Sequence, residues 1–404
     1  MARILIAGGS LGGLLAANLL LRDGHDVTVL EKAAGSLDGR GAGIVTHPAL
    51  ARGLQRAGAT VDETLGVRVQ ERIVLGADGA VLGRRHLPQV LTSWSRLYAM
   101  LYEVFPAERY RHAMAVQRVE ETADGVRAVT ESGATFDADL LIASDGIRSA
   151  VRAQFAPQAT PRYAGYVAWR GVCEEGALST HTLSTLFDQF GFGLPAGEQM
   201  IGYPVAGAGN TTGRGQRRYN FVWYRAADEA GVLRELMTAA DGLHYPLGIP
   251  PHKVDPRRIA AMREAAHRLL APQFAEVLDK TLQPFLQPIH DVWSDQLAFG
   301  RVGLMGDAGF VARPHVGMGV TKAADDACAL SDSIRAHGAT PAALRAYEAV
   351  RLRPSQTVVQ RARDLGAYMQ AQGSGGRDNA SRDAQSVLAD TAIDPAEFQA
   401  ALAR

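Results

Sequence analysis

Residues 3–24 constrain the fold of this chain more than any other part of the sequence. Residues 3–7 (RILIA) are an apolar run of strand length, the turn GGSLGG follows, and an apolar helical segment then extends to Leu21. Residues 26–32 (DVTVLEK) have the composition of a second strand. A strand, a glycine-rich turn, a helix and another strand form a βαβ unit, which builds a parallel sheet covered by helices. We therefore predict an α/β protein.

The glycine-rich turn has the spacing of a dinucleotide-binding turn. Such a turn needs a small residue at the tight bend, at the close approach to a pyrophosphate and at the helix–strand contact. Gly8, Ser10 and Gly13 hold these places, and Glu31 ends the second strand where an acid binds ribose hydroxyls. This predicts NAD or FAD binding rather than a turn that only packs a helix on a strand. The predicted contacts are Gly8, Ser10, Leu11, Gly12, Gly13, Glu31 and Lys32.

Two later strand ends carry similar motifs. An apolar strand ends at Ser144-Asp145-Gly146, and residues 301–307 (RVGLMGD) end at Asp307 before Gly317-Met318-Gly319 opens a helix. Ligands of open α/β sheets bind at the carboxyl ends of strands, and a helix N-terminus favours negative charge, such as a reduced flavin carries. Plain strand-to-helix turns are the alternative. The predicted cofactor contacts here are Asp145, Gly146, Gly306, Asp307, Ala308, Pro314, Gly317, Met318 and Gly319, whereas Asp325 and Asp326 are expected to be surface or capping charges.

Composition excludes several other classes of function. The 42 basic and 42 acidic side chains balance, which gives no electrostatic case for nucleic acid or an anionic membrane. The apolar N-terminal run is interrupted by glycines, Ser10 and Asn18, so we expect neither a secretory leader nor an anchor and predict a cytoplasmic protein. Cys173 and Cys328 lack metal-ligand spacing and are expected to be free thiols, and no metal site is predicted.

The order of elements predicts two domains and a tail. Strand-like stretches such as YVAWRGV, QMIGYPV and RYNFVWY interrupt the α/β pattern, which returns near residue 290. The predicted nucleotide domain comprises residues 1–70, 96–162 and 290–371; the β-rich substrate domain comprises 71–95 and 163–289; and the tail, 372–404, carries a short helix at 395–403. The helical segment 341–371 leaves two alternatives open, a homodimer contact or packing on the nucleotide domain.

Together the three motifs resemble the para-hydroxybenzoate hydroxylase-like class of single-component FAD monooxygenases. That class carries the glycine-rich turn with a distal glutamate, a mid-chain Asp-Gly and a late G-D-A…P…G-x-G motif, all present here in the same order over about residues 1–370. Within the class, the stretches GGSLGGL, GAGIVTHPAL, YAGYVAWRG and GDAGFVARPH are most similar to dihydroxypyridine hydroxylases. The resemblance also implies FAD contacts at Arg40, Gly43 and Arg96.

The resemblance implies a reaction. FAD would be reduced by NADH or NADPH and capture dioxygen, and the flavin C(4a)-hydroperoxide would hydroxylate an electron-rich aromatic or N-heteroaromatic ring, with a dihydroxypyridine as first-choice substrate. The ring must be activated and shielded from water. His47, His315, Tyr203 and Tyr224 are the candidate catalytic residues, with Trp223 beside them, although the aromatic residues have core packing as an alternative. One of the two histidines is predicted to orient or deprotonate a ring hydroxyl.

Three alternatives remain at this point. The same fold would serve hydroxylation or oxidative decarboxylation of another phenolic or enolic metabolite, because fold alone does not fix a substrate. A non-catalytic FAD-binding protein would bind the cofactor without substrate-stimulated NAD(P)H oxidation. An NAD-dependent dehydrogenase would leave the motif at residues 306–319 without a purpose.

Overall fold

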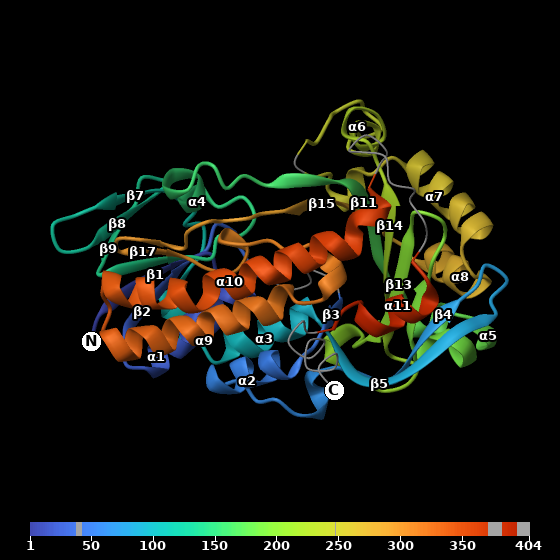
Figure 1. Cartoon of the computed structure of the whole chain (residues 1–404), viewed down its shortest axis with the longest axis horizontal. Helices are drawn as coiled ribbons and strands as arrows, with labels where there is room; N and C mark the ends of the chain where they lie inside the picture. Colours follow the sequence, from blue (N-terminus) through green and yellow to red (C-terminus); the bar gives the residue numbers. More distant parts are fainter. Residues whose placement is uncertain (38–42, 247, 371–381, 394–404) are drawn as a thin grey trace.

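The computed structural model describes residues 1–37, 43–246, 248–370 and 382–393, whose strands form three sheets (Figure 1). The first has the order β16 (Ala298–Phe299), β17 (Val302–Leu304), β10 (Leu140–Ala143), β1 (Arg3–Ala7), β2 (Asp26–Leu30) and β6 (Tyr110–Arg111). From β17 to β6 all neighbours are parallel, and only the edge strand β16 is antiparallel. The predicted α/β fold with a parallel sheet is confirmed.

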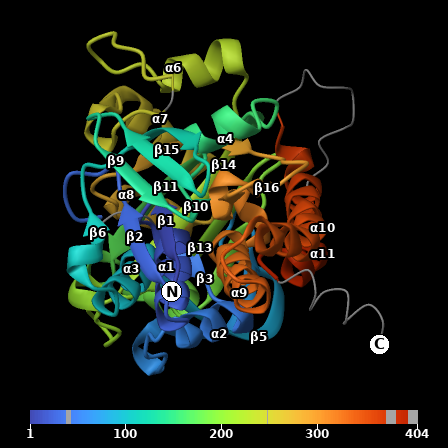
Figure 2. The same cartoon turned by 90° about the vertical axis from the view of Figure 1, so that its left-hand side faces the viewer.

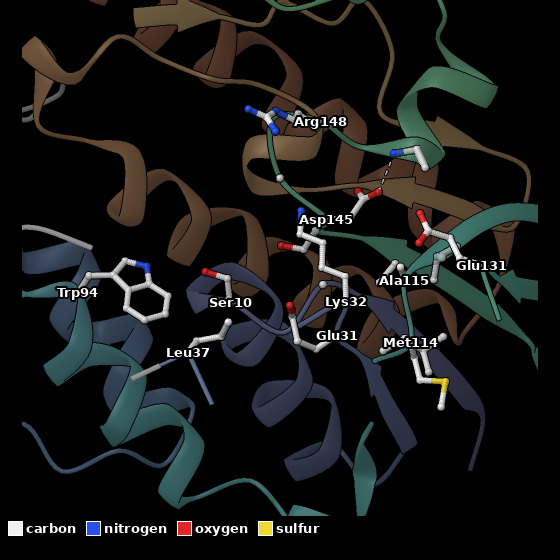
Figure 3. Close-up of a pocket in the computed structure, with 17 residues that line it drawn as sticks. Ser10, Glu31, Lys32, Leu37, Trp94, Met114, Ala115, Glu131, Asp145 and Arg148 are labelled. Carbon is white, nitrogen blue, oxygen red and sulfur yellow. Dashed lines mark hydrogen bonds between the residues drawn. The ribbon is translucent and has the colours of Figure 1, made fainter. Parts of the chain in front are cut away.

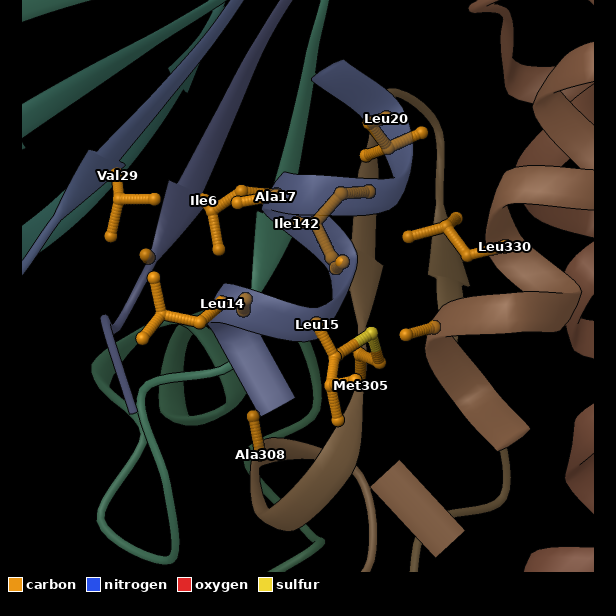
Figure 4. Packing of buried hydrophobic residues seen from close by; sticks show 14 of the residues in the cluster. Ile6, Leu14, Leu15, Ala17, Leu20, Val29, Ile142, Met305, Ala308 and Leu330 are labelled. Atoms are coloured by element: carbon orange, nitrogen blue, oxygen red, sulfur yellow. The ribbon is translucent and has the colours of Figure 1, made fainter. Parts of the chain in front are cut away.

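The first sheet is buried on both faces. Ile4, Leu5 and Ile6 of β1 are all buried, as a strand covered on two sides requires. Helix α1 (Leu11–Arg22) packs between the sheet and α9 (Gly319–His337), and Figure 4 shows Leu15 of α1 close to Met305 in this cluster. Helix α10 (Pro341–Gly366) lies beside α9 (Figure 2).

A three-stranded antiparallel sheet contacts the first sheet on the side away from α1 (Figures 1 and 2). Its strands are β7 (Val116–Glu121), β8 (Val126–Thr130) and β9 (Thr135–Ala138). The turns Asp124-Gly125 and Ser132-Gly133 connect them, as the hairpin pattern of the sequence predicts.

The second large sheet is mostly antiparallel. Its order is β15 (Phe285–Asp291), β11 (Arg162–Glu174), β14 (Arg218–Ala226), β13 (Gln199–Val205), β12 (Phe190–Gly193), β4 (Val67–Leu75), β5 (Val81–Ser93) and β3 (Gly43–Val45). Because side chains alternate along a strand, Trp223 enters the core beneath α7 (Pro256–Leu269) and α8 (Pro272–Lys280), while Tyr224 enters the core on the opposite face. Trp223 is therefore a packing residue.

Shorter helices complete the fold. They are α2 (Pro48–Arg56), α3 (Trp94–Glu103), α4 (Ala150–Phe155), α5 (Thr180–Thr182), α6 (Arg234–Leu236) and α11 (Ala384–Asp390). The tail helix predicted at 395–403 lies outside the described residues, as does Arg40. Strand β3 pairs with β5 although it belongs to the range 1–70, so the division into two domains stays a prediction. Within the described ranges, no helix has the length and apolar character needed to cross a membrane.

Asp291 connects the second sheet to the part of the chain that packs on the first sheet. It ends β15 and is almost completely buried, and its carboxylate accepts hydrogen bonds from Arg313 Nε (2.8 Å) and from Arg363 Nη2 of α10 (2.7 Å). Arg313 is itself buried and lies directly before the loop of residues 314–317. Asp291 therefore fixes the second sheet to that loop and to the long helix.

Asp291→Asn is expected to lower the free energy of unfolding by about 3 kcal/mol, because it leaves the buried Arg313 cation without its counter-charge. Urea unfolding in the presence of excess FAD measures the change. Asp295→Asn, at an exposed position close by, is the control and should stay within about 0.5 kcal/mol of the original protein. Equal stability of the two variants would contradict this role of Asp291.

Candidate functional site

Three strand ends meet at one edge of the parallel sheet. Ala7 of β1 is in register with Ala143 of β10, which is in register with Leu304 of β17. The turns that follow these residues therefore lie side by side. Gly8 has a φ of +97°, and a Cβ placed on it would lie 2.4 Å from the Ser144 carbonyl oxygen. Both the backbone angle and the lack of space restrict this position to glycine.

A first cavity of about 360 Å³ opens above these turns (Figure 3). Six residues predicted as cofactor contacts border it: Gly8, Ser10, Glu31, Lys32, Asp145 and Gly146. Leu37, Trp94, Met114 and Arg148, which the sequence did not single out, also border it. The first two predicted motifs therefore form one cavity.

The two acidic residues of this cavity have different partners. Glu31 is buried, and its carboxylate accepts hydrogen bonds from the Gly9 and Ala33 amides, both at 2.8 Å. Asp145 Oδ2 accepts from the Ala150 amide at 2.9 Å, but Oδ1 is buried and has no hydrogen-bond partner among the described residues (Figure 3). Burial raises the pKa of Asp145. A ligand hydroxyl that donates to Oδ1 would remove this deficit, which fits the ribose and ribityl hydroxyls of FAD.

A second cavity, also about 360 Å³, lies between the late motif and the second sheet. The predicted residues that border it are Gly43, Tyr203, Tyr224, Asp307, Pro314, His315, Gly317 and Gly319. Trp94 borders both cavities, so the two lie on either side of its side chain. This arrangement suits an extended cofactor with a nucleotide at one end and a ring system at the other. Gly319 begins α9, and a Cβ placed on it would have no atom within 4 Å, which leaves the helix N-terminus accessible.

A buried network of charged side chains supports the turn at Gly306, on the side away from the second cavity. Asp326 Oδ2 accepts from the Gly306 amide (3.1 Å) and from Lys322 Nζ (3.2 Å), and Arg351 Nε donates to Oδ1 (2.7 Å). Lys322 Nζ also donates to the Gly306 carbonyl at 3.0 Å. Burial alone would raise the pKa of Asp326, but Lys322 and Arg351 outweigh it and hold the pKa below its usual range. The expectation that Asp326 is a surface or capping charge is wrong, because this residue anchors the Gly306 turn.

Asp307 lies in the same turn, on the side that faces the second cavity. Its side chain is exposed to the second cavity, yet the protein around it removes enough water to raise its pKa, with Lys322 acting in the opposite direction. Asp307 is therefore accessible from the cavity although much of its surroundings is protein. Its carboxylate is placed to contact a cofactor there.

His315 is neutral and tightly enclosed. Its Nε2 lies 2.8 Å from Tyr166 Oη, and the Tyr224 ring packs edge-on at 4.3 Å between centroids. Burial, together with the charges of Arg313 and Arg382, lowers the pKa of His315 to about 3. Nδ1 is buried without a hydrogen-bond partner among the described residues. The imidazole is therefore uncharged over the whole neutral pH range.

Other predicted residues lie outside the two cavities. His47 Nε2 is 3.2 Å from the Gly317 carbonyl oxygen, and His47 borders a separate third cavity. Arg96 donates to the side chain and the carbonyl of Thr64 and borders neither of the first two cavities. Six further predicted contacts border neither cavity and lie on the sides of the turns that face away from the cavities: Leu11, Gly12, Gly13, Gly306, Ala308 and Met318.

Four residues that shape the site are absent from the predicted site residues. Trp94 separates the cavities, Tyr166 binds His315 and Lys322 supports Gly306. The fourth, Arg170, is a residue for which the sequence pattern leaves a structural role as open as a functional one, and it places a cation at the second cavity. A signal existed for Lys322, which is four residues before Asp326 and therefore on the same helix face. Arg170 stands among the apolar residues of β11, where a charged side chain already indicates a special partner.

Replacing Lys322 by Met should weaken FAD binding about tenfold or more, because a buried charged hydrogen bond contributes about 1.5–3 kcal/mol. FAD, the cofactor expected from the sequence, would be titrated into the apoprotein and its fluorescence followed. Lys280→Met, at an exposed position on α8, is the control. An unchanged affinity in the Lys322 variant would show that the network does not support the cofactor turn.

His315→Gln should reduce the loss of stability in acid. In the unfolded chain His315 takes up a proton below its ordinary pKa of 6.5, whereas in the folded protein it stays neutral down to about 3, so stability is lost as the pH falls through this window. Between pH 7.5 and 5.0 the original protein should lose about 2 kcal/mol more than the variant. Urea unfolding at both pH values, with excess FAD, tests this; equal losses would contradict a neutral His315.

Comparisons with known proteins agree with this geometry. Residues 1–181 match a family model described as FAD binding domain, and residues 163–291 match one described as FAD binding domain-like. The chain is 31% identical over 373 residues to 2,6-dihydroxypyridine 3-monooxygenase of Paenarthrobacter nicotinovorans, with 92% of each chain covered. It is 29% identical over 379 residues to FAD-dependent urate hydroxylase of Klebsiella pneumoniae, covering 89% of this chain and 88% of the other.

A solved structure supports the same assignment. The 2,6-dihydroxypyridine-3-hydroxylase from Arthrobacter nicotinovorans superposes with a TM-score of 0.85 and 28% identity, covering 95% of this chain and 97% of that chain. The identity and coverage, the three meeting strand-end motifs and the unpartnered Asp145 oxygen together give one conclusion. The chain belongs to the para-hydroxybenzoate hydroxylase-like class of FAD-dependent monooxygenases.

Proposed function

We propose that this monooxygenase hydroxylates a small hydroxylated N-heteroaromatic ring, with a dihydroxypyridine as the first-choice substrate, in the second cavity. The observation that carries the proposal is the lining of that cavity, where the Arg170 cation and the neutral His315 stand among aromatic and aliphatic walls. The similarity to enzymes named for dihydroxypyridine and urate supports a heteroaromatic substrate. The second cavity measures about 360 Å³, and the cofactor's ring system would occupy part of it, so the room that is left favours a substrate with a single ring.

The reaction balances with the cofactors of the class. One oxygen atom of dioxygen enters a ring C–H bond, the other leaves as water, and NADH or NADPH supplies the two electrons. FAD, held by the turns at Gly8, Asp145 and Gly319, would supply the redox chemistry by which these electrons reach dioxygen and one oxygen atom reaches the ring. The protein's own residues bind and orient the ring, stabilise its charge and keep water away.

Arg170 is the group best placed to activate the ring. Its Nη1 donates to Gln287 Oε1 at 2.6 Å, while its Nε is buried and has no partner within the described part of the chain. An ionised ring hydroxyl is electron-rich and therefore more readily hydroxylated, and a guanidinium stabilises that anion by charge-assisted hydrogen bonds. Arg170 therefore favours the hydroxylate form of the substrate.

His315 and the tyrosines orient the ring rather than remove its proton. A histidine whose pKa lies near 3 is a weak base at neutral pH, so of the two predicted roles we favour orientation for His315. Burial raises the pKa of Tyr203 to about 12 and that of Tyr224 still further, which keeps both hydroxyl groups protonated as donors. His47 contacts the Gly317 backbone and acts, in this proposal, by holding the loop. Normal hydroxylation by both His47→Ala and His315→Ala would contradict these roles.

Arg170→Met should raise the KM for the dihydroxypyridine about tenfold or more without loss of FAD, because a charged hydrogen bond contributes about 1.5–3 kcal/mol. The difference in KM should grow as the pH rises through the pKa of the free substrate, because the ionised ring is the form that Arg170 stabilises. Arg170→Lys keeps the charge and should recover part of the affinity. Initial-rate measurements at several pH values check this, and a KM equal to that of the original enzyme would remove Arg170 from the proposal.

The experiment that tests the function is a substrate scan with the purified, FAD-loaded enzyme. NADH and NADPH consumption is measured with hydroxypyridines, hydroxybenzoates and enolic compounds, and product masses are recorded. Strong stimulation by a dihydroxypyridine with a gain of one oxygen supports the proposal. Stimulation only by another phenol or enol selects the alternative substrate class, and bound FAD with no stimulation by any compound selects a non-catalytic flavoprotein.

Three further predictions accompany the proposal and have their own tests. Cytoplasmic location, the two-domain division and a homodimer contact at residues 341–371, which is one of the two alternatives for that segment, rest on the sequence pattern alone. Cell fractionation tests the location, limited proteolysis the domain division and sedimentation analysis the homodimer.

A further inference from the structure

Residues 382–393, here called the C-terminal segment, pack onto the second sheet beside the second cavity. Helix α11 lies along β4 and β5 (Figure 1), and Val387 and Leu388 are fully buried in the hydrophobic cluster that contains Tyr203 and Tyr224. Ala392 borders the second cavity and is the residue that this segment contributes to it within the described ranges. The C-terminal segment therefore forms part of the cavity wall.

Arg72 holds the end of this segment. It lies on β4 with no exposed surface, and its guanidinium donates to the carbonyl oxygens of Thr391 (2.5 Å), Ala392 (3.1 Å) and Leu388 (3.5 Å) as well as to Gln89 Oε1 (2.7 Å). Carbonyls at a helix C-terminus have no partner within the helix and need one from outside. A buried cation likewise needs acceptors, so Arg72 and the segment stabilise each other.

Further charges fix the segment from its outer side. Arg361 of α10 donates to Asp390 Oδ2 at 2.9 Å, and Arg382 contacts the same oxygen. Arg85 donates to the Leu388 carbonyl at 3.3 Å. The segment is thus attached to both β4 and α10, and its inner end has little freedom to move.

Ala392 packs against the loop that carries His315. Its amide donates to the His315 carbonyl at 2.8 Å, and its φ is +54°, in the left-handed region that L residues rarely adopt. A Cβ placed on Gly317 would lie 2.8 Å from the Ala392 Cβ, so only glycine at 317 leaves room for the alanine. Ala392 thus lies between this loop and the second cavity, which it borders.

We propose that residue 392, positioned by Arg72, sets the size of the ring that the second cavity admits. The inference rests on the proposed function, because it takes this cavity as the site of the aromatic ring. A side chain larger than alanine at residue 392 would add atoms at the wall of the second cavity. Because this cavity measures only about 360 Å³, a few added atoms would reduce the space for the ring appreciably. Arg72 is a positioning residue here, since it touches the segment and not the ring.

The first test replaces Ala392 by Asn and by Gly. Both residues tolerate a positive φ better than other residues do, so the backbone should keep its path. The ring-induced change in flavin absorbance gives the Kd for a dihydroxypyridine and for a bicyclic hydroxyquinoline. Ala392→Asn should weaken dihydroxypyridine binding about tenfold or more, as the addition of a group to a filled pocket does, and Ala392→Gly should improve hydroxyquinoline binding relative to dihydroxypyridine. FAD content should stay unchanged in both.

The second test replaces Arg72 by Met and uses Arg84→Met as the control. Arg84 lies on β5, is exposed and pairs with Glu71 away from the segment. Arg72→Met should speed amide hydrogen exchange in residues 384–392 and raise the KM for the ring, while NADH oxidation without a ring and FAD content stay at the original level. Arg84→Met should change none of these. A loss of FAD and of basal oxidation in Arg72→Met would instead show a general structural role.

The outcomes separate this inference from the proposed function. If the original enzyme binds no ring and shows no stimulated oxidation, the proposed function fails. If it binds and hydroxylates a ring but Ala392→Asn and Ala392→Gly keep its Kd for both rings, residue 392 does not set ring size and the inference is wrong. A shift in ring preference with unchanged FAD content supports it.

Discussion

Parallel pairing of β1, β10 and β17 is the constraint on which the site depends. These strands come from residues 3–7, 140–143 and 302–304, and their carboxyl ends are held in register at one edge of the sheet. The turns beyond them are in direct contact, since Gly8 has no room for a side chain beside Ser144. Buried Arg152 adds a further link by donating to the Ala308 carbonyl at 3.0 Å. A displacement of any one strand would therefore disturb all three turns.

Charge in the interior is distributed unevenly between the two ends of the site. Behind the cofactor turns, Asp326 is neutralised by two cations and acts through the backbone of Gly306. At the second cavity the Arg170 cation and the Asp307 carboxylate both border the space, and burial keeps the pKa of His315 low; in the proposed function Arg170 stabilises the ring as an anion. Low polarity around these groups strengthens each interaction compared with water. The same burial that costs solvation energy thus strengthens the charge interactions at both ends of the site.

Much of the fold and of the cofactor site could be predicted because the signals are local. An apolar strand followed by glycine, as at Ala7-Gly8 and at Leu304 to Gly306, indicates a strand end wherever it occurs, and parallel pairing then brings such ends together. The partners of Arg72 and Lys322 are different, because they depend on contacts across the fold that no local pattern gives. Asp326 was misjudged for this reason: a charged pair on a helix is usually solvated, and only packing against α10 shows otherwise.

Strand periodicity gave weaker guidance in the second sheet. Trp223 and Tyr224 are neighbours with the same aromatic character, and alternation places them on opposite faces without indicating which face meets a ligand. The fully buried stretch of β13 carries no polar–apolar alternation at all, so Tyr203 could not be assigned to either face before the structure was known.

The late position of β17 has a consequence for how the protein folds as it is synthesised. Until residues 302–304 leave the ribosome, β10 has no partner on one side, and the edge of the growing sheet presents unpaired backbone groups. The N-terminal βαβ unit can form early, but the sheet cannot close around its ligand until most of the chain exists. Long-range parallel pairing of this kind is slow and leaves strand edges open to other chains. Chains that end before β17 are therefore expected to need chaperone protection even though all of their local elements are present.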